Sequence, residues 1–340
     1  MTERRQPAVA LLGEGETARR WASALRSGAT LRPYPDELPG GIDALVLVAG
    51  AHDPFARAKE ALSAGVHVLF ATPFLLSPWQ AGILDALSRR QGRILRFLEP
   101  FQYGRGFRFL RRLLEGREPF WRPLYLRTLC LAMPEGGARI DELATQELAV
   151  CDALLDGEPQ HVTASAARRD EVGEVCAAFL AVQYADGPLV QCTISVAEAP
   201  GVRQLVAVMA ERTVIMDELD PVAPLRILGS DEAASHDDLL HATTCGQEGD
   251  VADAVVAEAK RFVGAVVDDD ISMSNSERWT RVAGLWWAAR QSMSFGGPVD
   301  VPSMPLYSGQ TTPPPLRVIE GGGKTAGATR SRPALTVVAN

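Results

Sequence analysis

The stretch Pro7–Trp21, PAVALLGEGETARRW, decides the fold of the first part of the chain. Its apolar run, Ala8–Leu12, leads into a glycine turn and then a helical pattern, which predicts strand, tight turn and helix. Gly13 supplies the turn, Gly15 lets the backbone approach a pyrophosphate, and the small Ala18 allows the helix to pack on the strand. The stretch therefore predicts dinucleotide-binding geometry, and the alternative is a turn that only joins strand to helix.

Short apolar strands and helices alternate after this turn. Strands are expected at Ala44–Val48, Val66–Phe70 and Arg93–Leu98, and helices at Phe55–Ala64 and Pro78–Arg90. The alternation predicts a parallel, doubly wound sheet, because helical crossovers join parallel strands. A ligand of such a sheet lies at the carboxyl ends of its strands.

The segment Ala29–Tyr34 lies where a second strand should run and end in an acid that binds the adenosine ribose. Asp36 follows the glycines by about 20 residues, as that acid does. Because Pro33 and Pro35 interrupt a central strand, we interpret Asp36 as a loop residue. Arg32 is either a solvated side chain or a contact for the 2′-phosphate of NADP, so the choice between NAD and NADP stays open.

The sequence changes character past Trp121. Strand-like segments separated by turn residues predict a mainly antiparallel sheet, and they are Leu124–Leu131, Val162–Ala166, Ala177–Tyr184, Leu189–Val196, Gln204–Val208 and Thr213–Met216. Helix-like segments are Asp141–Leu155, Asp253–Val266 and Ser276–Ser292. The fold class is therefore α/β plus α+β. We expect a Rossmann domain at 1–120, an α+β domain for substrate binding and oligomerisation at 121–306, and a flexible tail at 307–340.

Composition and charge exclude several classes of protein. The net charge of -8 and the pI of about 5.3 disfavour binding to nucleic acid. No apolar run reaches roughly 18 residues and no signal-peptide h-region precedes the first strand, so we expect a cytoplasmic protein without membrane contact. The five cysteines are scattered, and we interpret the acidic run Asp268–Asp270 as a solvated loop, so no metal site is predicted.

Several phrases of the sequence resemble those of one enzyme family. ALSAGVHVL at Ala61–Leu69 is very similar to the family phrase ALxAGKHVL. Further landmarks follow in the family's order, at Gly13–Gly15, Ala51–Pro54, Glu99–Tyr103, Leu155–Pro159 and Ser292 with Gly297–Val299. Together they resemble the Gfo/Idh/MocA oxidoreductases, the group of glucose-fructose oxidoreductase and inositol dehydrogenase, over most of the chain.

This resemblance implies a nicotinamide cofactor, NAD or NADP, and a small-molecule substrate. It implies a cofactor site formed by Gly13, Gly15, Glu16, Thr17, Ala49, His52, Thr72 and Pro73. It also implies a homodimer or homotetramer that pairs through the face of the antiparallel sheet. Trp279 and Trp286-Trp287 pack a helix onto the sheet or onto a partner subunit.

The residues that carry the family's chemistry are not retained. The lysine of its Glu-Lys-Pro motif is Thr72, which can only form hydrogen bonds where the family has an ammonium beside the substrate hydroxyl. Its Asp-x-Gly-x-His-x-x-Asp pattern aligns best with ELATQELA, which places Gln146 at the histidine and Ala149 at the last aspartate. An alignment shifted by one residue brings Glu147 to the histidine position instead.

Two hypotheses about function follow. The first is an atypical NAD(P)-dependent oxidoreductase that reduces a small carbonyl or imine in biosynthesis, because alcohol oxidation needs a base that Gln146 does not supply. A reduction needs only a proton donor, for which the candidates are Tyr103, Glu142, Glu147 or a water held by Thr72. The alternative is a non-redox or inactive relative that acts as an accessory, scaffold or sensor protein.

Overall fold

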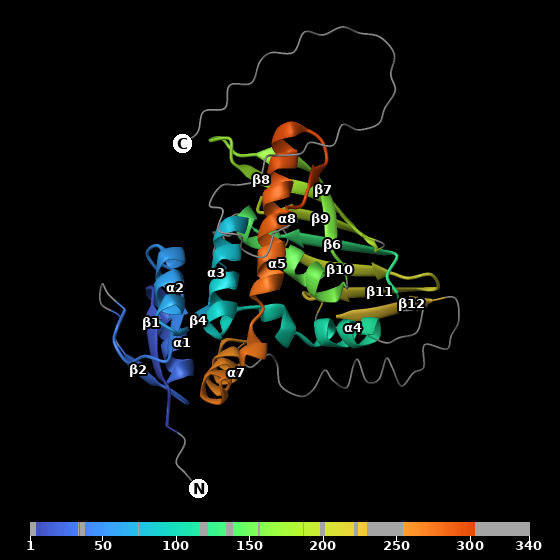
Figure 1. The fold of residues 1–340 in the computed structure, drawn as a ribbon. Coiled ribbons are helices and arrows are strands. Elements are labelled where there is room, and N and C mark those ends of the chain that lie inside the picture. Colours follow the sequence, from blue (N-terminus) through green and yellow to red (C-terminus); the bar gives the residue numbers. More distant parts are fainter. Residues whose placement is uncertain are drawn as a thin grey trace, which may run out of the picture.

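The computed structural model describes residues 5–32, 34, 38–73, 75–115, 122–133, 139–155, 157–185, 187–197, 201–220, 224–229 and 254–302. Figure 1 shows a parallel sheet with its helices on one side of the molecule and a large second sheet on the other. Asp36, Trp121 and the predicted tail at 307–340 lie outside the described residues.

The first sheet confirms the predicted parallel architecture. Its strands are β1 (Ala8–Leu12), β2 (Thr30–Arg32), β3 (Ala44–Leu47), β4 (His67–Phe70) and β5 (Leu95–Phe97). They follow the order β2-β1-β3-β4-β5, and every neighbouring pair is parallel. The direction of strand order reverses between β1 and β3, so the ligand crevice of such a sheet opens at their carboxyl ends.

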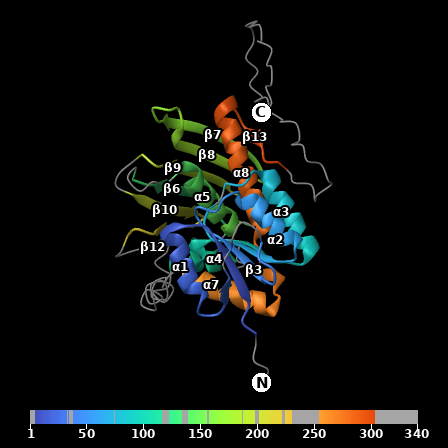
Figure 2. The ribbon, with the colours of Figure 1, turned by 90° about the vertical axis from the view of Figure 1, so that its left-hand side faces the viewer.

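Helices cover both faces of this sheet. They are α1 (Gly15–Leu25), α2 (Pro54–Ser63), α3 (Pro78–Gln91) and α7 (Ala254–Asp268). Alternate residues of β3 point to opposite sides, so Leu45 and Leu47 pack with α2 and α3 whereas Ala44 and Val46 pack with α1 and α7. Figure 2 shows α2 and α3 together, with α7 below the sheet. The chain thus returns from its second half to complete the first domain.

The second sheet confirms the mainly antiparallel prediction. Its strands are β6 (Tyr125–Leu131), β7 (Pro159–Arg169), β8 (Val175–Tyr184), β9 (Leu189–Ser195), β10 (Val202–Val208), β11 (Arg212–Asp217), β12 (Leu225–Gly229) and β13 (Val299–Asp300). Their order is β12-β11-β10-β6-β9-β8-β7-β13. Only β6 and β9 pair in parallel among these described strands.

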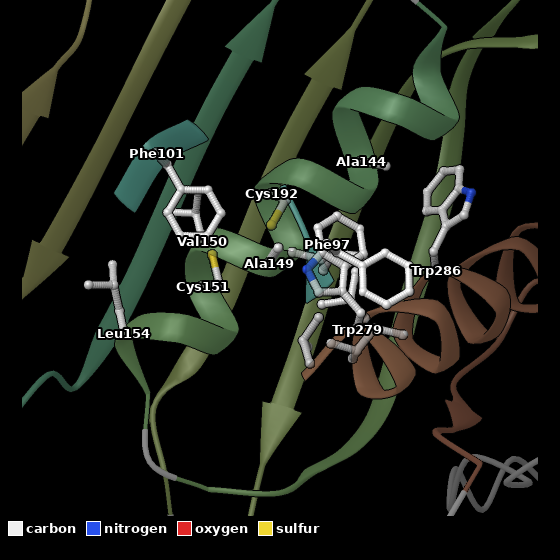
Figure 3. Packing of buried hydrophobic residues seen from close by; sticks show 14 of the residues in the cluster. Phe97, Phe101, Ala144, Ala149, Val150, Cys151, Leu154, Cys192, Trp279 and Trp286 are labelled. Carbon is white, nitrogen blue, oxygen red and sulfur yellow. The ribbon is translucent and has the colours of Figure 1, made fainter. Parts of the chain in front are cut away.

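Two helices, α5 (Ile140–Leu154) and α8 (Ser276–Phe295), lie between the sheets, as Figure 1 shows. The backbone of Phe97 exchanges two hydrogen bonds, of 2.8 and 2.9 Å, with the side chain of Asn275, which satisfies the edge of β5 where α8 begins. The ring of Phe97 stacks on Phe70 at 4.7 Å and on Trp279 at 5.2 Å between centroids. One hydrophobic core therefore runs from the first sheet through α8 to the second (Figure 3).

Buried ion pairs also stabilise the junction between the first sheet, α5 and α8. Glu99, which follows β5 and is fully buried, accepts hydrogen bonds from Arg278 at 3.1 Å and from the indole of Trp279 at 3.1 Å. Asp152 of α5 accepts a hydrogen bond of 2.9 Å from Arg281 of α8. Burial raises the pKa of Asp152, and the neighbouring arginines oppose that shift. Partners on both sides of the junction make these carboxylates structural.

Candidate active site

The glycine turn packs closely against the end of β3. Gly13 has φ +135°, and a Cβ on it would lie 2.5 Å from Val48 Cγ2 and 2.6 Å from the Ala49 carbonyl oxygen. The backbone N–H of Glu14 donates to that same carbonyl at 2.9 Å. Only glycine fits this position, because an L side chain meets both strain and collision there.

The start of α1 has the features of an anion site. Gly15 is the first helical residue, with φ +79°, and a Cβ built on it meets nothing within 4 Å. Glu14 stands at the N-cap without a side-chain capping bond, so its side chain leaves the first N–H groups of α1 available. This cradle fits a pyrophosphate, which such N–H groups and the helix dipole attract.

Carboxylates surround the same cradle. Glu14 and Glu16 are both exposed, one before and one within the first turn of α1, and Thr17 beside them is half-buried. A carboxylate this close to a dinucleotide repels its phosphates, although solvent screens the repulsion. The backbone geometry therefore favours a pyrophosphate and the side chains weaken its binding.

The loop after β3 borders the glycine turn. Gly50 has φ +81°, and a Cβ on it would lie 3.2 Å from the Glu14 nitrogen. Ala49 and His52 are exposed in this loop, and Asp53 caps α2 by accepting from the Ala56 N–H at 3.0 Å. These predicted cofactor residues thus share one edge of the sheet with Gly13.

Thr72 and Pro73 follow β4, the next strand along this edge. The hydroxyl Oγ1 of Thr72 is buried and has no hydrogen-bond partner among the described residues. A buried polar group left without a partner costs about 1–3 kcal/mol. An oxygen or nitrogen atom of a ligand would satisfy this hydroxyl, so Thr72 is the residue of the strand ends with the clearest capacity to hold a substrate.

Tyr103 directs its hydroxyl toward α7. The residue closes the 3₁₀ helix η1 (Pro100–Tyr103) and donates to Glu258 at 2.5 Å. Glu258 is fully buried and also pairs with Arg96 at 2.5 Å. Burial, and then the charge of Glu258, raise the pKa of Tyr103 to about 12. The proton of Tyr103 is thereby held in a structural cluster on the α1 and α7 side of the first sheet.

The candidates on α5 lie on different faces of that helix. Glu147 is buried and accepts from Arg203 of β10 at 3.2 Å, and burial raises the pKa of its carboxyl group. Its side chain is thus engaged with the second sheet. Glu142 and Gln146 are half-buried and lie one turn apart, and Ala149 is fully buried.

A cavity of about 190 Å³ lies beside the Thr72 loop, between α3, α5 and α8. Its walls are Leu75, Leu76, Ser77, Pro78, Phe97, Asp141, Thr145, Trp279, Val282, Ala283, Trp286, Trp287 and Arg290. Trp279 and Trp286 also belong to the core, as the sequence predicted, and Figure 3 shows both projecting from α8. The spacing of these tryptophans did not reveal the cavity, because core and cavity walls share one helical period.

Two other kinds of site are absent from the parts of the chain just described. No helix among the described residues is long and apolar enough to cross a membrane. Within the same residues, no group of three or more histidine, cysteine or acidic side chains is arranged to hold a metal ion.

Comparisons with known proteins identify solved structures that share this fold. No protein-family model and no curated protein sequence matches the chain. The solved structure of UDP-N-acetylglucosamine 3-dehydrogenase GnnA from Acidithiobacillus ferrooxidans matches with a TM-score of 0.68 at 20% identity, over 85% of this chain and 98% of that one. The WlbA dehydrogenase from Bordetella pertussis, in complex with NADH and UDP-GlcNAcA, matches with a TM-score of 0.72 at 14% identity, over 89% and 100%.

A third structure, levoglucosan dehydrogenase in complex with NADH, matches with a TM-score of 0.70 at 13% identity, over 88% of this chain and 100% of that one. All three are dehydrogenases, and each is covered almost from end to end. With the parallel sheet, the antiparallel sheet and α5 and α8 between them, the chain has the fold of the Gfo/Idh/MocA-type NAD-dependent dehydrogenases.

Proposed function

We propose that the chain is an NAD(P)-dependent oxidoreductase that reduces a small carbonyl or imine substrate. One observation carries this proposal: the open cradle at Gly15 and the unpartnered hydroxyl of Thr72 lie at the carboxyl ends of the same sheet. A parallel sheet binds its ligands at that edge. In this proposal residues 1–120 hold the dinucleotide and residues 121–306 complete the substrate site.

The direction of the reaction follows from the groups around the site. Oxidation of an alcohol requires a base, and neither the amide of Gln146 nor the methyl group of Ala149 accepts a proton near neutral pH. Reduction does not require that base. Thr72 would donate its hydroxyl proton in a hydrogen bond to the substrate oxygen or nitrogen, and Glu142, half-buried on α5, would line the other side of the substrate.

The bound nicotinamide would supply the hydride. The chain's own residues hold the dinucleotide through the N–H groups of α1 and orient the substrate through Thr72. Tyr103 is a poor proton donor, because its pKa is raised to about 12 and its hydroxyl is bonded to Glu258. A carbonyl substrate therefore takes its proton from Glu142 or from water.

Arg32 is the residue that we propose to select the cofactor. It is the last residue of β2 and is exposed. In this fold the end of that strand approaches the adenosine ribose. A guanidinium at that place favours a 2′-phosphate. We expect NADPH to bind more tightly than NADH, and Arg32→Ala to remove the difference.

A titration with NADH and NADPH, followed by nicotinamide fluorescence, tests the proposal. Micromolar binding of either cofactor, lost in a Gly15→Asp variant, would support an oxidoreductase. Glu14 and Glu16 favour a second candidate, a non-redox relative that acts as an accessory or sensor protein, because their charges repel a pyrophosphate. Absence of binding at millimolar cofactor, by a protein shown to be folded by circular dichroism, would select that second candidate.

The uncovered face of the second sheet supports a homodimer, which we propose as the assembly. Leu180 and Val190 point into the core, whereas Phe179 and Leu189, next to them on the same strands, are 50% and 40% exposed on the opposite face. Exposed apolar side chains on an uncovered sheet face are consistent with an interface. A Phe179→Asp variant should elute as a monomer in light-scattering chromatography, and an unchanged mass would contradict this interface.

A further inference from the structure

We propose that the cavity between α3, α5 and α8 binds a small ring that carries a positive charge, a cyclic ammonium or iminium ion. The proposal rests on the proposed function for its second step, in which this ring is the substrate. Binding of the ring itself depends only on the walls of the cavity.

Four aromatic side chains line the cavity. Trp279, Trp286 and Trp287 of α8 line it together with Phe97 of β5. Trp287 is held in place by an edge-to-face contact with Trp79, with centroids 5.5 Å apart. The faces of tryptophan rings attract cations, and an enclosure of several rings is the usual way in which proteins bind organic ammonium groups.

Asp141 supplies the negative charge at one corner. The side chain is 12% exposed, and its Oδ1 accepts hydrogen bonds from Trp286 Nε1 at 2.8 Å and from Arg290 Nη1 at 3.3 Å. Its other oxygen, Oδ2, lies 3.7 Å from Arg139 Nη2, which is beyond hydrogen-bond length. Oδ2 thus retains the capacity to accept an N–H from a ligand.

Arg290 does not fill the role of the cation. Its side chain is 58% exposed and reaches Asp141 from the solvent side at hydrogen-bond length on Oδ1 alone. Solvent around the exposed guanidinium screens its interaction with Asp141. A ligand cation inside the cavity competes with it weakly, so removing Arg290 should strengthen cation binding, whereas an anionic ligand would need Arg290.

The volume selects the size of the ligand. The cavity measures about 190 Å³, and an apolar cavity of about 150 Å³ holds one benzene ring. One six-membered ring with a nitrogen in it or on it therefore fits. A sugar nucleotide or another large substrate would extend far outside these walls.

An iminium ion also matches the chemistry of the strand ends. Leu75–Pro78, one wall of the cavity, begin three positions after Thr72 in the chain. When hydride from a reduced nicotinamide dinucleotide adds to the carbon of C=N⁺, the π electrons move to nitrogen and a neutral amine forms. No proton is needed in that step. The reduction of an iminium therefore does not require the histidine that this sequence replaces with Gln146, whereas the oxidation of most alcohols requires such a base.

Three ligands with one ring and three charges test the cavity. Cyclohexylammonium, cyclohexanol and cyclohexanecarboxylate are titrated into the full-length protein by calorimetry at neutral pH, without dinucleotide. We expect cyclohexylammonium to bind at least fivefold more tightly than cyclohexanol, and the carboxylate to bind least. Equal binding of the first two, tighter binding of the carboxylate, or no binding of any would overturn the proposal.

Matched variants assign the charge preference to its residues. Asp141→Asn should remove the preference for the cation, and Arg290→Gln should increase it. Glu277→Gln is the control, because it neutralises an exposed carboxylate on α8 that does not line the cavity. Because Asp141→Asn alters a buried group, its melting temperature is measured first, and Trp287→Leu, which touches no hydrogen bond of Asp141, provides a second loss of binding. An unchanged affinity in both would refute the assignment.

The binding experiments can reject the cation site and the proposed function separately. Cyclohexylammonium binding with no NADH or NADPH binding would retain the cation site and reject the reductase. Dinucleotide binding with no preference among the three rings would reject the cation site alone.

Discussion

Two neighbouring glycines should respond differently to the same substitution. Gly13→Ala places a methyl group 2.5 Å from Val48 Cγ2 and 2.6 Å from the Ala49 oxygen, at φ +135°. Overpacking of this kind costs about 1–3 kcal/mol and positive φ about 1–2 kcal/mol, so the free energy of unfolding should fall by about 2–5 kcal/mol. Gly15→Ala meets nothing within 4 Å at φ +79°, so only the backbone strain of about 1–2 kcal/mol applies.

Cofactor binding should be weakened more by Gly15→Ala than the small loss of stability in that variant would suggest. The Gly15→Ala methyl group occupies the open space above the first N–H groups of α1, where we place the pyrophosphate. A loss of about 1.4 kcal/mol there weakens binding tenfold. We therefore expect Gly15→Ala to lower the melting temperature by only about 2–4 °C and to weaken dinucleotide binding at least tenfold.

Gly41 provides the matched control. It has φ +71° with nothing within 4 Å of a built Cβ, so Gly41→Ala carries similar strain without touching the cradle. Melting temperatures from scanning calorimetry and dissociation constants from nicotinamide fluorescence are measured for all three variants. If Gly15→Ala binds dinucleotide as tightly as Gly41→Ala, the pyrophosphate does not lie on α1. If Gly13→Ala is as stable as the unmodified protein, the steric argument is wrong.

The other predictions concern stability and the strand ends. Burial lowers the pKa of His67 from 6.5 to about 4, with the charge of Arg93 lowering it further and that of Asp269 opposing the shift. Between these two pH values the unfolded chain protonates His67 and the folded protein does not. The free energy of unfolding should therefore be highest above pH 6.5 and fall by up to roughly 3 kcal/mol as the pH drops toward 4. Urea unfolding of His67→Asn should show a flatter dependence over that window, and parallel curves would contradict the assignment. Glu258→Gln leaves Arg96 buried with its charge uncompensated, so it should cost about 3–5 kcal/mol in the same assay, and a loss below 1 kcal/mol would show the pair to be unimportant. Thr72→Val keeps the shape and removes the unpartnered hydroxyl, so we expect an equal or higher melting temperature together with a reductase rate at least tenfold lower; an unchanged rate would exclude Thr72 from the site.

Parts of the fold were predictable because buried strands and helices have recognisable apolar patterns in the sequence. The strands β1, β3, β4 and β5 are covered on both faces and therefore appear as continuous apolar runs. β12 was not predicted, since all five of its residues are exposed or half-buried and its apolar pattern is weak. Helix α4 (Arg105–Glu115) was also missed, although its Phe107 and Leu110 are buried.

The place of an element was harder to predict than its type. Helix α7 was expected from its apolar stripe, but that stripe does not say which sheet it covers, and it packs beside α1 on the first sheet. The same limit applies to the candidate site. Tyr103 follows a strand of the parallel sheet, as a site residue would, but its hydroxyl reaches Glu258, which lies 155 positions further along the chain. No local pattern records a partner at that distance.

The return of α7 to the first sheet has a consequence during synthesis on the ribosome. The face that carries Val46, Leu69 and Ile94 is completed only when Phe262 and its neighbours on α7 arrive. All five strands of that sheet precede Ala254, and translation of the stretch between Phe97 and Ala254 takes on the order of 10–30 s. For that time the nascent first domain keeps an apolar face uncovered, so a fragment that ends before α7 should aggregate or recruit a chaperone, and the first domain is completed only after most strands of the second sheet have been translated.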